Sequence, residues 1–210
     1  MRQIRKRVVV LISGGGSNML ALADACAADD FPAEIVGVIS DRKDAGGLAK
    51  AEARGIPTFA FERKDFGSKA EHEGAVLEAL ATLKPDLICL AGYMRLLSSD
   101  FIRPYEGRIL NIHPSLLPLF PGLHTHQRAI EAGMKVAGCT VHIVTEGMDE
   151  GPIIAQSAVP ILHDDTAQSL ADRVLIVEHK TYRLALQKIA LSKGQPREPA
   201  FGPDQYIISI

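Results

Sequence analysis

The sequence predicts a single α/β domain with a Rossmann-like, doubly wound and mostly parallel sheet whose C-terminal part is antiparallel. Short β-branched runs alternate with alanine-rich and leucine-rich segments of helical pattern, as parallel strands joined by crossover helices require. The 210 residues suffice for one sizeable core. We expect residues 1–107 to form a mononucleotide- or phosphate-binding half, 108–192 a catalytic half, and 193–210 an irregular tail.

Each expected element rests on a local pattern. Strands are predicted at 7–12, 34–40, 58–61, 86–91, 108–112, 138–144 and 153–159, and helices at 17–28, 45–54, 68–83 and 125–132. Prolines at 114, 118 and 121 stiffen one loop, and the two strands that soon follow predict the antiparallel part. A long amphipathic helix then begins near Asp165 or Thr166, either of which suits an N-cap. Its apolar side chains predict that it covers one face of the sheet: Leu170, Val174, Val177, Leu184 and Ile189.

Composition narrows the class of protein. Apolar residues make up 47% and charged residues 23%, with a net charge of -2, which excludes disorder and a broad nucleic-acid-binding surface. The three cysteines, Cys26, Cys89 and Cys139, form no CxxC pair and disfavour both a disulfide framework and a zinc site. No apolar run approaches the roughly 18 residues of a membrane span, and no signal peptide is evident. We expect a cytoplasmic protein.

A glycine-rich loop follows the first expected strand and precedes the first helix. Its residues are Ser13-Gly14-Gly15-Gly16-Ser17-Asn18. Glycines permit a tight turn that exposes amide groups at a helix N-terminus, where a phosphate is favoured. Asp41 after the second strand would suit a dinucleotide, but Met19 replaces the third glycine of that fingerprint, so a phosphate monoester fits better. A tight turn without a ligand remains the alternative.

An amide, an imidazole and a carboxylate form the candidate catalytic set. Asn111 and His113 are two residues apart at a strand end, so their side chains leave the same face. Asn111 can donate to an oxygen that becomes negative, and His113 can act as acid or base near neutral pH. Asp149, in a glycine-flanked turn, can pair with the imidazole or order a water. Together they suit chemistry at a carbonyl carbon without a metal, although each alone is commonly a structural residue.

Three further histidines have open roles. His124 and His126 are two apart at a helix start, but no third ligand accompanies them, so capping or surface roles fit better than a metal site. His142 lies on a strand beside the expected site, where core packing and an auxiliary role are equally consistent with its position.

Four segments together resemble the folate-dependent formyltransferases, and the similarity extends from the Ser13 loop to Glu178. These segments are Asn111-Ile112-His113-Pro114-Ser115-Leu116-Leu117-Pro118, Gly122-Leu123-His124-Thr125-His126, Gly138-Cys139-Thr140-Val141-His142 and Met148-Asp149-Glu150-Gly151-Pro152-Ile153-Ile154. The glycine loop and the Gly122 segment resemble the branch that acts in purine biosynthesis. The resemblance implies transfer of the formyl group of 10-formyltetrahydrofolate to the amine of glycinamide ribonucleotide, with no metal and no nucleic-acid or membrane partner, by a monomer or homodimer.

The resemblance also implies roles for particular residues. Asn111 and His113 would stabilise the oxyanion, and Asp149 would support His113 and the proton transfer. The expected ribonucleotide contacts are Gly15, Gly16, Ser17, Asn18, Pro114 and Glu178. The expected folate contacts are Lys69, Met94, Arg95, Leu96, Leu97, Val144 and His142, with the turn at 144–149 framing the pteridine.

Two rivals remain from the sequence. A formyltetrahydrofolate deformylase would share the Asn, His and Asp set but pass the formyl group to water. A non-catalytic nucleotide-binding protein would use the glycine loop alone, and that interpretation leaves Asn111, His113 and Asp149 without a purpose.

Overall fold

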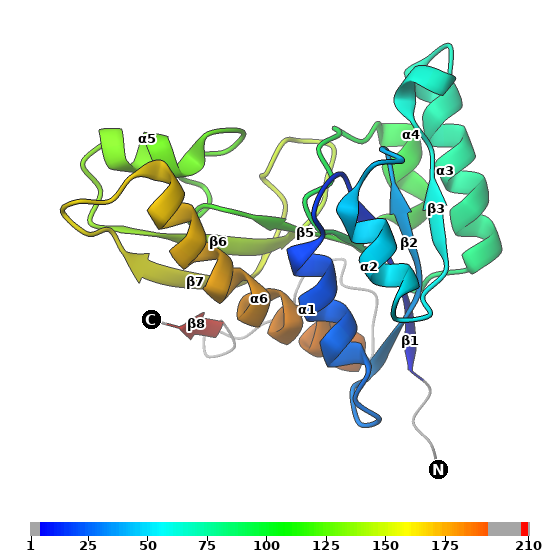
Figure 1. Cartoon of the computed structure of the whole chain (residues 1–210), viewed down its shortest axis with the longest axis horizontal. Coiled ribbons are helices and arrows are strands. Elements are labelled where there is room, and N and C mark those ends of the chain that lie inside the picture. The colour runs from blue at the N-terminus through cyan, green and yellow to red at the C-terminus, as the bar shows by residue number, and fades with distance from the viewer. Residues whose placement is uncertain (1–4, 193–206, 210) are drawn as a thin grey trace.

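A computed structural model describes residues 5–192 and 207–209 of the chain. Within them, eight strands form one sheet in the order β3-β2-β1-β4-β5-β6-β7-β8 (Figure 1). The strands are β1 (Lys6–Ile12), β2 (Ala33–Ser40), β3 (Thr58–Ala60), β4 (Leu87–Leu90), β5 (Ile109–His113), β6 (Val136–Ile143), β7 (Ile153–Pro160) and β8 (Ile207–Ser209). The first seven lie within about two residues of the expected ranges.

The α-helices connect and cover the strands. They are α1 (Ser17–Cys26), α2 (Gly46–Glu52), α3 (Lys69–Leu83), α4 (Ser99–Ile102), α5 (Thr125–Glu131) and α6 (Ala167–Leu191). The sequence did not predict α4 or the 3-10 turns Arg63–Asp65 and Arg103–Tyr105, because segments of three or four residues carry no periodic apolar pattern.

Both faces of the sheet are covered, as a doubly wound sheet requires. Val8, Val10 and Ile12 of β1 point into the core under α1, α2 and α6. Val9 and Leu11 point to the opposite face, into the core under α3 and α4. These five side chains are fully buried, which is why β1 is a continuous apolar run rather than an alternating one.

The sheet changes direction after β5. Strands β3, β2, β1, β4 and β5 are parallel, whereas β5 pairs with β6, and β6 with β7, in antiparallel register. The predicted antiparallel part is therefore confirmed. β8 pairs with β7 in parallel, so the expected irregular tail contains a strand at 207–209, and residues 193–206 and 210 lie outside the described residues.

Helix α6 lies beside α1 across one face of the sheet (Figure 1). Thr166 is its N-cap and forms a capping box with Ser169, which confirms the predicted start. Leu170, Val174 and Ile189 are buried as expected, but Leu184 is exposed. The prediction for Leu184 was wrong because the buried stripe over that turn passes through positions 181, 182, 185 and 186.

Candidate functional site

A cavity of about 590 Å³ lies at the carboxyl ends of β4 and β5. Its walls come from the segments after these strands, the start of α5 and the turn at 144–149, with Asn18 and Glu178 contributed by α1 and α6. In the strand order, β1 lies between β2 and β4, so the parallel sheet reverses its winding beside this cavity. Open α/β sheets bind ligands at such a switch point.

The predicted catalytic side chains meet on one wall of this cavity. Asn111 and His142 are directly opposite each other across β5 and β6, and Asn111 Nδ2 lies 3.2 Å from His142 Nε2. His113 follows two residues along β5, and its Nδ1 lies 3.4 Å from Asp149 Oδ2. The three residues of the predicted set therefore lie together.

Asp149 is held where it can face both histidines. Its Oδ2 accepts a hydrogen bond from the Gly122 amide at 2.9 Å, and its Oδ1 lies 3.8 Å from His142 Nε2. The Asp149 backbone has φ 56, the left-handed conformation that an aspartate tolerates better than most residues. Its side chain is 13% exposed, so its charge acts on His113 with little screening by solvent.

The proline-rich loop orients His113. The Phe120 carbonyl lies 3.1 Å from His113 Nε2, and because a carbonyl can only accept, Nε2 carries a hydrogen. Nδ1 is then the ring nitrogen that faces the Asp149 carboxylate. A second proton on Nδ1 makes the two side chains an ion pair, which suits an imidazolium beside a developing oxyanion.

Buried polar contacts from β6 and β7 fix that loop. Thr140 Oγ1 donates to the Ser115 carbonyl at 2.7 Å and accepts from the Leu117 amide at 3.0 Å. Gln156 Nε2 donates to the Leu117 carbonyl at 2.9 Å. The antiparallel part of the sheet thus sets the loop that carries the Phe120 carbonyl to His113.

The glycine loop lies between β1 and α1, as predicted. Gly16 is the N-cap of α1 with φ 70, and a Cβ there would lie 2.8 Å from Gly47 Cα, so the close packing of these two glycines requires both. Among the described residues, the amides of Gly15, Gly16 and Ser17 donate to no protein acceptor. These three residues do not line the cavity, whereas Asn18 does.

Asn18 and Glu178 link the start of α1 to α6. Asn18 Nδ2 donates to Glu178 Oε2 at 2.7 Å, while Asn18 Oδ1 is buried without a partner in the described chain. Burial raises the pKa of Glu178 above its ordinary value, and the Asn18 hydrogen bond opposes that rise. Both residues face the cavity, so the orphaned oxygen and the carboxylate are available to a polar ligand.

Most of the predicted folate contacts line the cavity. They are Met94, Arg95, Leu96, Leu97, Val144 and His142. Lys69, the first residue of α3, does not line it. Its ammonium lies 3.7 Å from the Glu73 carboxylate, one turn further along the same helix. Met94 and Leu96 are 66% and 61% exposed, which is unusual for large apolar side chains and marks the rim as a binding surface.

The residue considered for a dinucleotide ribose is buried and paired through one of its two carboxylate oxygens. Asp41 is buried after β2, and its Oδ2 lies 2.6 Å from Arg95 Nε. This ion pair joins the end of β2 to the segment after β4. Asp41 Oδ1 is buried without a hydrogen-bond partner in the described residues.

The sequence did not single out Tyr93 and Ile102, which also line the cavity. Tyr93 adjoins the predicted Met94 segment, so its position gave a signal. Ile102 belongs to α4, which was not predicted.

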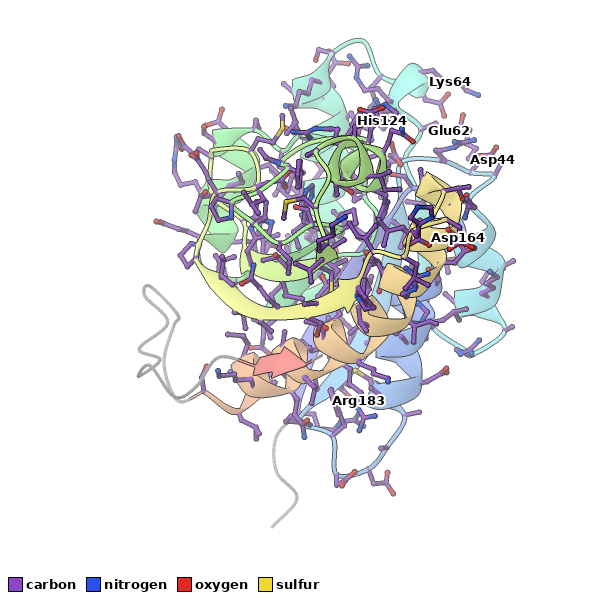
Figure 2. All side chains as sticks on the ribbon, turned by 90° about the vertical axis from the view of Figure 1, so that its left-hand side faces the viewer. Asp44, Glu62, Lys64, His124, Asp164 and Arg183 are labelled. Carbon is purple, nitrogen blue, oxygen red and sulfur yellow. The ribbon has the colours of Figure 1, made fainter. Side chains whose placement is uncertain are left out.

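His124 and His126 have no common ligand. His124 is the exposed N-cap residue of α5 with φ 58, and its side chain makes no capping hydrogen bond (Figure 2). Burial lowers the pKa of His126, with His113 adding to that effect. Over residues 5–192 and 207–209, no group of three or more His, Cys, Asp or Glu side chains is placed to hold a metal ion.

Basic side chains beyond β2 and β3 are paired with acids. Lys64 Nζ lies 2.6 Å from Glu62, and Figure 2 shows both near Asp44 at one edge of the molecule. Asp44 itself lies 2.9 Å from Arg42, and Lys43 lies 2.8 Å from Asp65. This surface therefore presents neutralised pairs rather than a basic patch.

In the described parts of the chain, no helix has the length and apolar character needed to cross a membrane.

The fold and the cavity define a class of protein: a Rossmann-like α/β domain with an acid–base set at its switch point. A family profile described as formyl transferase matches residues 6–186, and the chain belongs to this family. The structure of a phosphoribosylglycinamide formyltransferase from Brucella melitensis is 70% identical, with a TM-score of 0.86 over 90% of this chain and 98% of that one.

Curated relatives are of two lengths. The Escherichia coli phosphoribosylglycinamide formyltransferase is 42% identical over 92% of this chain and 91% of its own length. The trifunctional purine biosynthetic protein adenosine-3 of Drosophila melanogaster is 50% identical over 89% of this chain. The chain spans only 14 to 19% of the trifunctional relatives from fly, chicken, cattle and human.

Proposed function

We propose that this chain transfers the formyl group of 10-formyltetrahydrofolate to the amine of glycinamide ribonucleotide, a step of purine biosynthesis. The observation that carries the proposal is the meeting of Asn111, His113 and Asp149 on the wall of a cavity that Asn18 and Glu178 also line. The first set suits a carbonyl under attack, and the Asn18–Glu178 pair suits a polar sugar. The names of the full-length relatives support this choice of substrate.

The proposed chemistry uses the side chains of this site. The substrate amine attacks the formyl carbon, and the new carbon–nitrogen bond forms as the formyl oxygen takes negative charge. An Asn111 N–H and a protonated His113 stabilise that oxygen, and preorganised donors of this kind typically contribute several kcal/mol. A proton then passes from the amine to the folate nitrogen, assisted by Asp149 directly or through a water, and the bond between the formyl carbon and that nitrogen breaks.

The ribonucleotide fits along the first turn of α1. The free amides of Gly15, Gly16 and Ser17 suit its phosphate, and the helix N-terminus favours that charge. Glu178, reached through Asn18, suits the sugar hydroxyls. Pro114, which follows His113 in the sequence, also lines the cavity and is a further proposed contact for the ribonucleotide.

The folate fits between the segment after β4 and the turn at 144–149. Met94, Leu96, Leu97 and Val144 give apolar walls for a flat pteridine. The Asp41 contact uses Arg95 Nε, so the outer nitrogens of the guanidinium remain available to a carboxylate of the folate tail. Lys69, at the start of α3 and 53% exposed, is a further proposed contact for that tail.

A deformylase, which passes the formyl group to water, is not favoured. The relatives that match this chain over most of their own length are named formyltransferases. The polar Asn18–Glu178 pair in the cavity lining also has no role in hydrolysis of the folate alone.

The test follows tetrahydrofolate release from 10-formyltetrahydrofolate with and without glycinamide ribonucleotide. We expect release to depend on the ribonucleotide and formylated ribonucleotide to appear in equal amount. Release at the same rate without the ribonucleotide would replace the proposal with a deformylase. Light scattering of the same sample would distinguish the monomer from the homodimer.

We also propose that the enzyme is cytoplasmic. Cys26, Cys89 and Cys139 are buried and free, and burial raises the pKa of each thiol to about 12, so the thiolate needed for disulfide exchange is disfavoured. Fractionation of cells that express a tagged copy would test the location.

A further inference from the structure

His142 is placed to act on Asn111 rather than on a ligand. It lies opposite Asn111 in the β5–β6 register and is 2% exposed. Its Nε2 lies 3.2 Å from Asn111 Nδ2, and its Nδ1 lies 3.0 Å from the Ile143 carbonyl. Both ring nitrogens are therefore occupied by protein atoms, which leaves a folate only the edge of the ring.

The contacts determine where the hydrogens lie. The Ile143 carbonyl can only accept, so His142 Nδ1 carries a hydrogen. In the neutral ring Nε2 is then an acceptor, and the nearest donor to it is the Asn111 amide nitrogen. Asn111 must therefore turn its NH₂ group towards His142, with one N–H used in that bond and the other left free.

The surroundings favour this tautomer and the neutral ring. Asp149 Oδ1, the carboxylate that would compete for a hydrogen on Nε2, lies 3.8 Å away, beyond hydrogen-bond distance. Burial lowers the pKa of His142, and the charge of His113 acts in the same direction, while the Ile143 bond and Asp149 oppose them. The shorter contact to Ile143 selects the Nδ1–H form.

We propose that His142 is a positioning residue for formyl transfer: as the Nδ1–H tautomer, it orients the Asn111 amide so that an N–H, not the carbonyl oxygen, faces the reacting formyl oxygen. The two ends of an asparagine amide have nearly the same shape, so packing alone does not choose between them. A flipped amide would place lone pairs against the developing negative charge. The inference rests on the proposed function for its role in the reaction, but its geometry stands independently.

Kinetics can separate positioning from folate contact. His142→Leu keeps a similar side-chain volume but has no hydrogen-bond acceptor. We expect kcat to fall about tenfold, the size of effect that the loss of one buried hydrogen bond typically has. The folate Kd should stay within about twofold of the parent value. His142→Gln, which can place an oxygen near the Nε2 position, should recover most of the activity. The effect of His142→Leu should vanish in an Asn111→Ala background, because the residue it orients is gone.

A matched control comes from His72, which is also 2% exposed and whose Nε2 lies 2.8 Å from the Phe61 carbonyl, away from the cavity lining. His72→Leu should lower the melting temperature without changing kcat. A His142→Leu loss that is confined to the folate Kd, or that persists in full with Asn111→Ala, would overturn the inference.

Nitrogen-15 NMR of the parent protein gives a test that needs no turnover and no folded variant. We expect the neutral His142 ring to carry its hydrogen on Nδ1 at pH 7. A hydrogen on Nε2 would overturn the inference whatever the kinetics. If the parent protein does not formylate glycinamide ribonucleotide, the proposed function fails, and the NMR result still decides whether His142 orients Asn111.

Discussion

Removal of the Asp149 charge is the most direct test of the proposed chemistry. Asp149→Asn keeps the size of the side chain, and its amide oxygen can still accept from the Gly122 amide, which gives Oδ2 a hydrogen bond of 2.9 Å. What disappears is the negative charge 3.4 Å from His113 Nδ1. The local shape should therefore survive while the electrostatics change.

The size of the effect follows from that distance. Two unit charges 3.4 Å apart attract by about 5 kcal/mol at an effective dielectric constant of about 20. Because the two side chains are only 8% and 13% exposed, screening is weak, but the cost of burying the charges offsets part of the attraction. A net loss of about 3 to 4 kcal/mol corresponds to two to three orders of magnitude in turnover.

The assay is steady-state formyl transfer from 10-formyltetrahydrofolate to glycinamide ribonucleotide, with calorimetric binding of each substrate. We expect kcat to fall about 100- to 1,000-fold and both dissociation constants to change little. The control is Asp165→Asn, because Asp165 is also a buried carboxylate, paired with Arg173 at 2.6 Å, but it does not line the cavity. That variant should melt at a lower temperature and turn over normally. Turnover of Asp149→Asn within tenfold of the parent, in a folded protein, would refute the role given to this charge.

Three further predictions concern other parts of the site and fold. Asn111→Ala should lower kcat by about two to three orders of magnitude, because it removes an oxyanion donor, and should lower the melting temperature slightly, because it also removes the hydrogen bond to His142; a mainly folate-binding defect would contradict this role. Glu178→Gln should weaken ribonucleotide binding and flatten the pH dependence of stability measured by urea unfolding. The pKa of Glu178 is raised in the folded state, so the parent loses stability as pH rises from about 4.5 through the folded-state pKa. A parent that instead gained stability from Glu178 in this pH window would contradict the prediction. Gly138→Ala should destabilise the protein by more than about 2 kcal/mol, because its Cβ would lie 2.0 Å from the Ser157 carbonyl oxygen. The control Gly74→Ala, in open space on α3, should not destabilise it. Equal urea midpoints for the two variants would show that the close packing at Gly138 does not matter for stability.

Much of the fold could be predicted because the signals were local. Continuous apolar strands such as β1, the glycine turn before α1 and the capping residue Thr166 each depend on neighbours in sequence. The short helix α4 was not predicted because four residues carry too little periodic pattern. Leu184 was wrongly predicted to be buried because the buried stripe of a long helix drifts relative to a fixed residue spacing.

The site shows the same division. Spacing alone indicated that Asn111 and His113 share a face, the glycine-flanked turn suggested Asp149 as their partner, and the glycine loop included Asn18. The resemblance added Glu178. The sequence could not show that Asp41 is paired with Arg95, because that contact joins residues 54 positions apart.

By itself, the sequence determined the class of fold, the residue types available for chemistry at a carbonyl and the family to compare. Only the tertiary structure decided how those residues act on one another. The register of β5 against β6 sets His142 against Asn111, and the loop fixed by Thr140 brings the Phe120 carbonyl to His113. Hydrogen bonds depend on distances of a few tenths of an ångström between segments far apart in the chain, and such distances are set by packing rather than by local sequence.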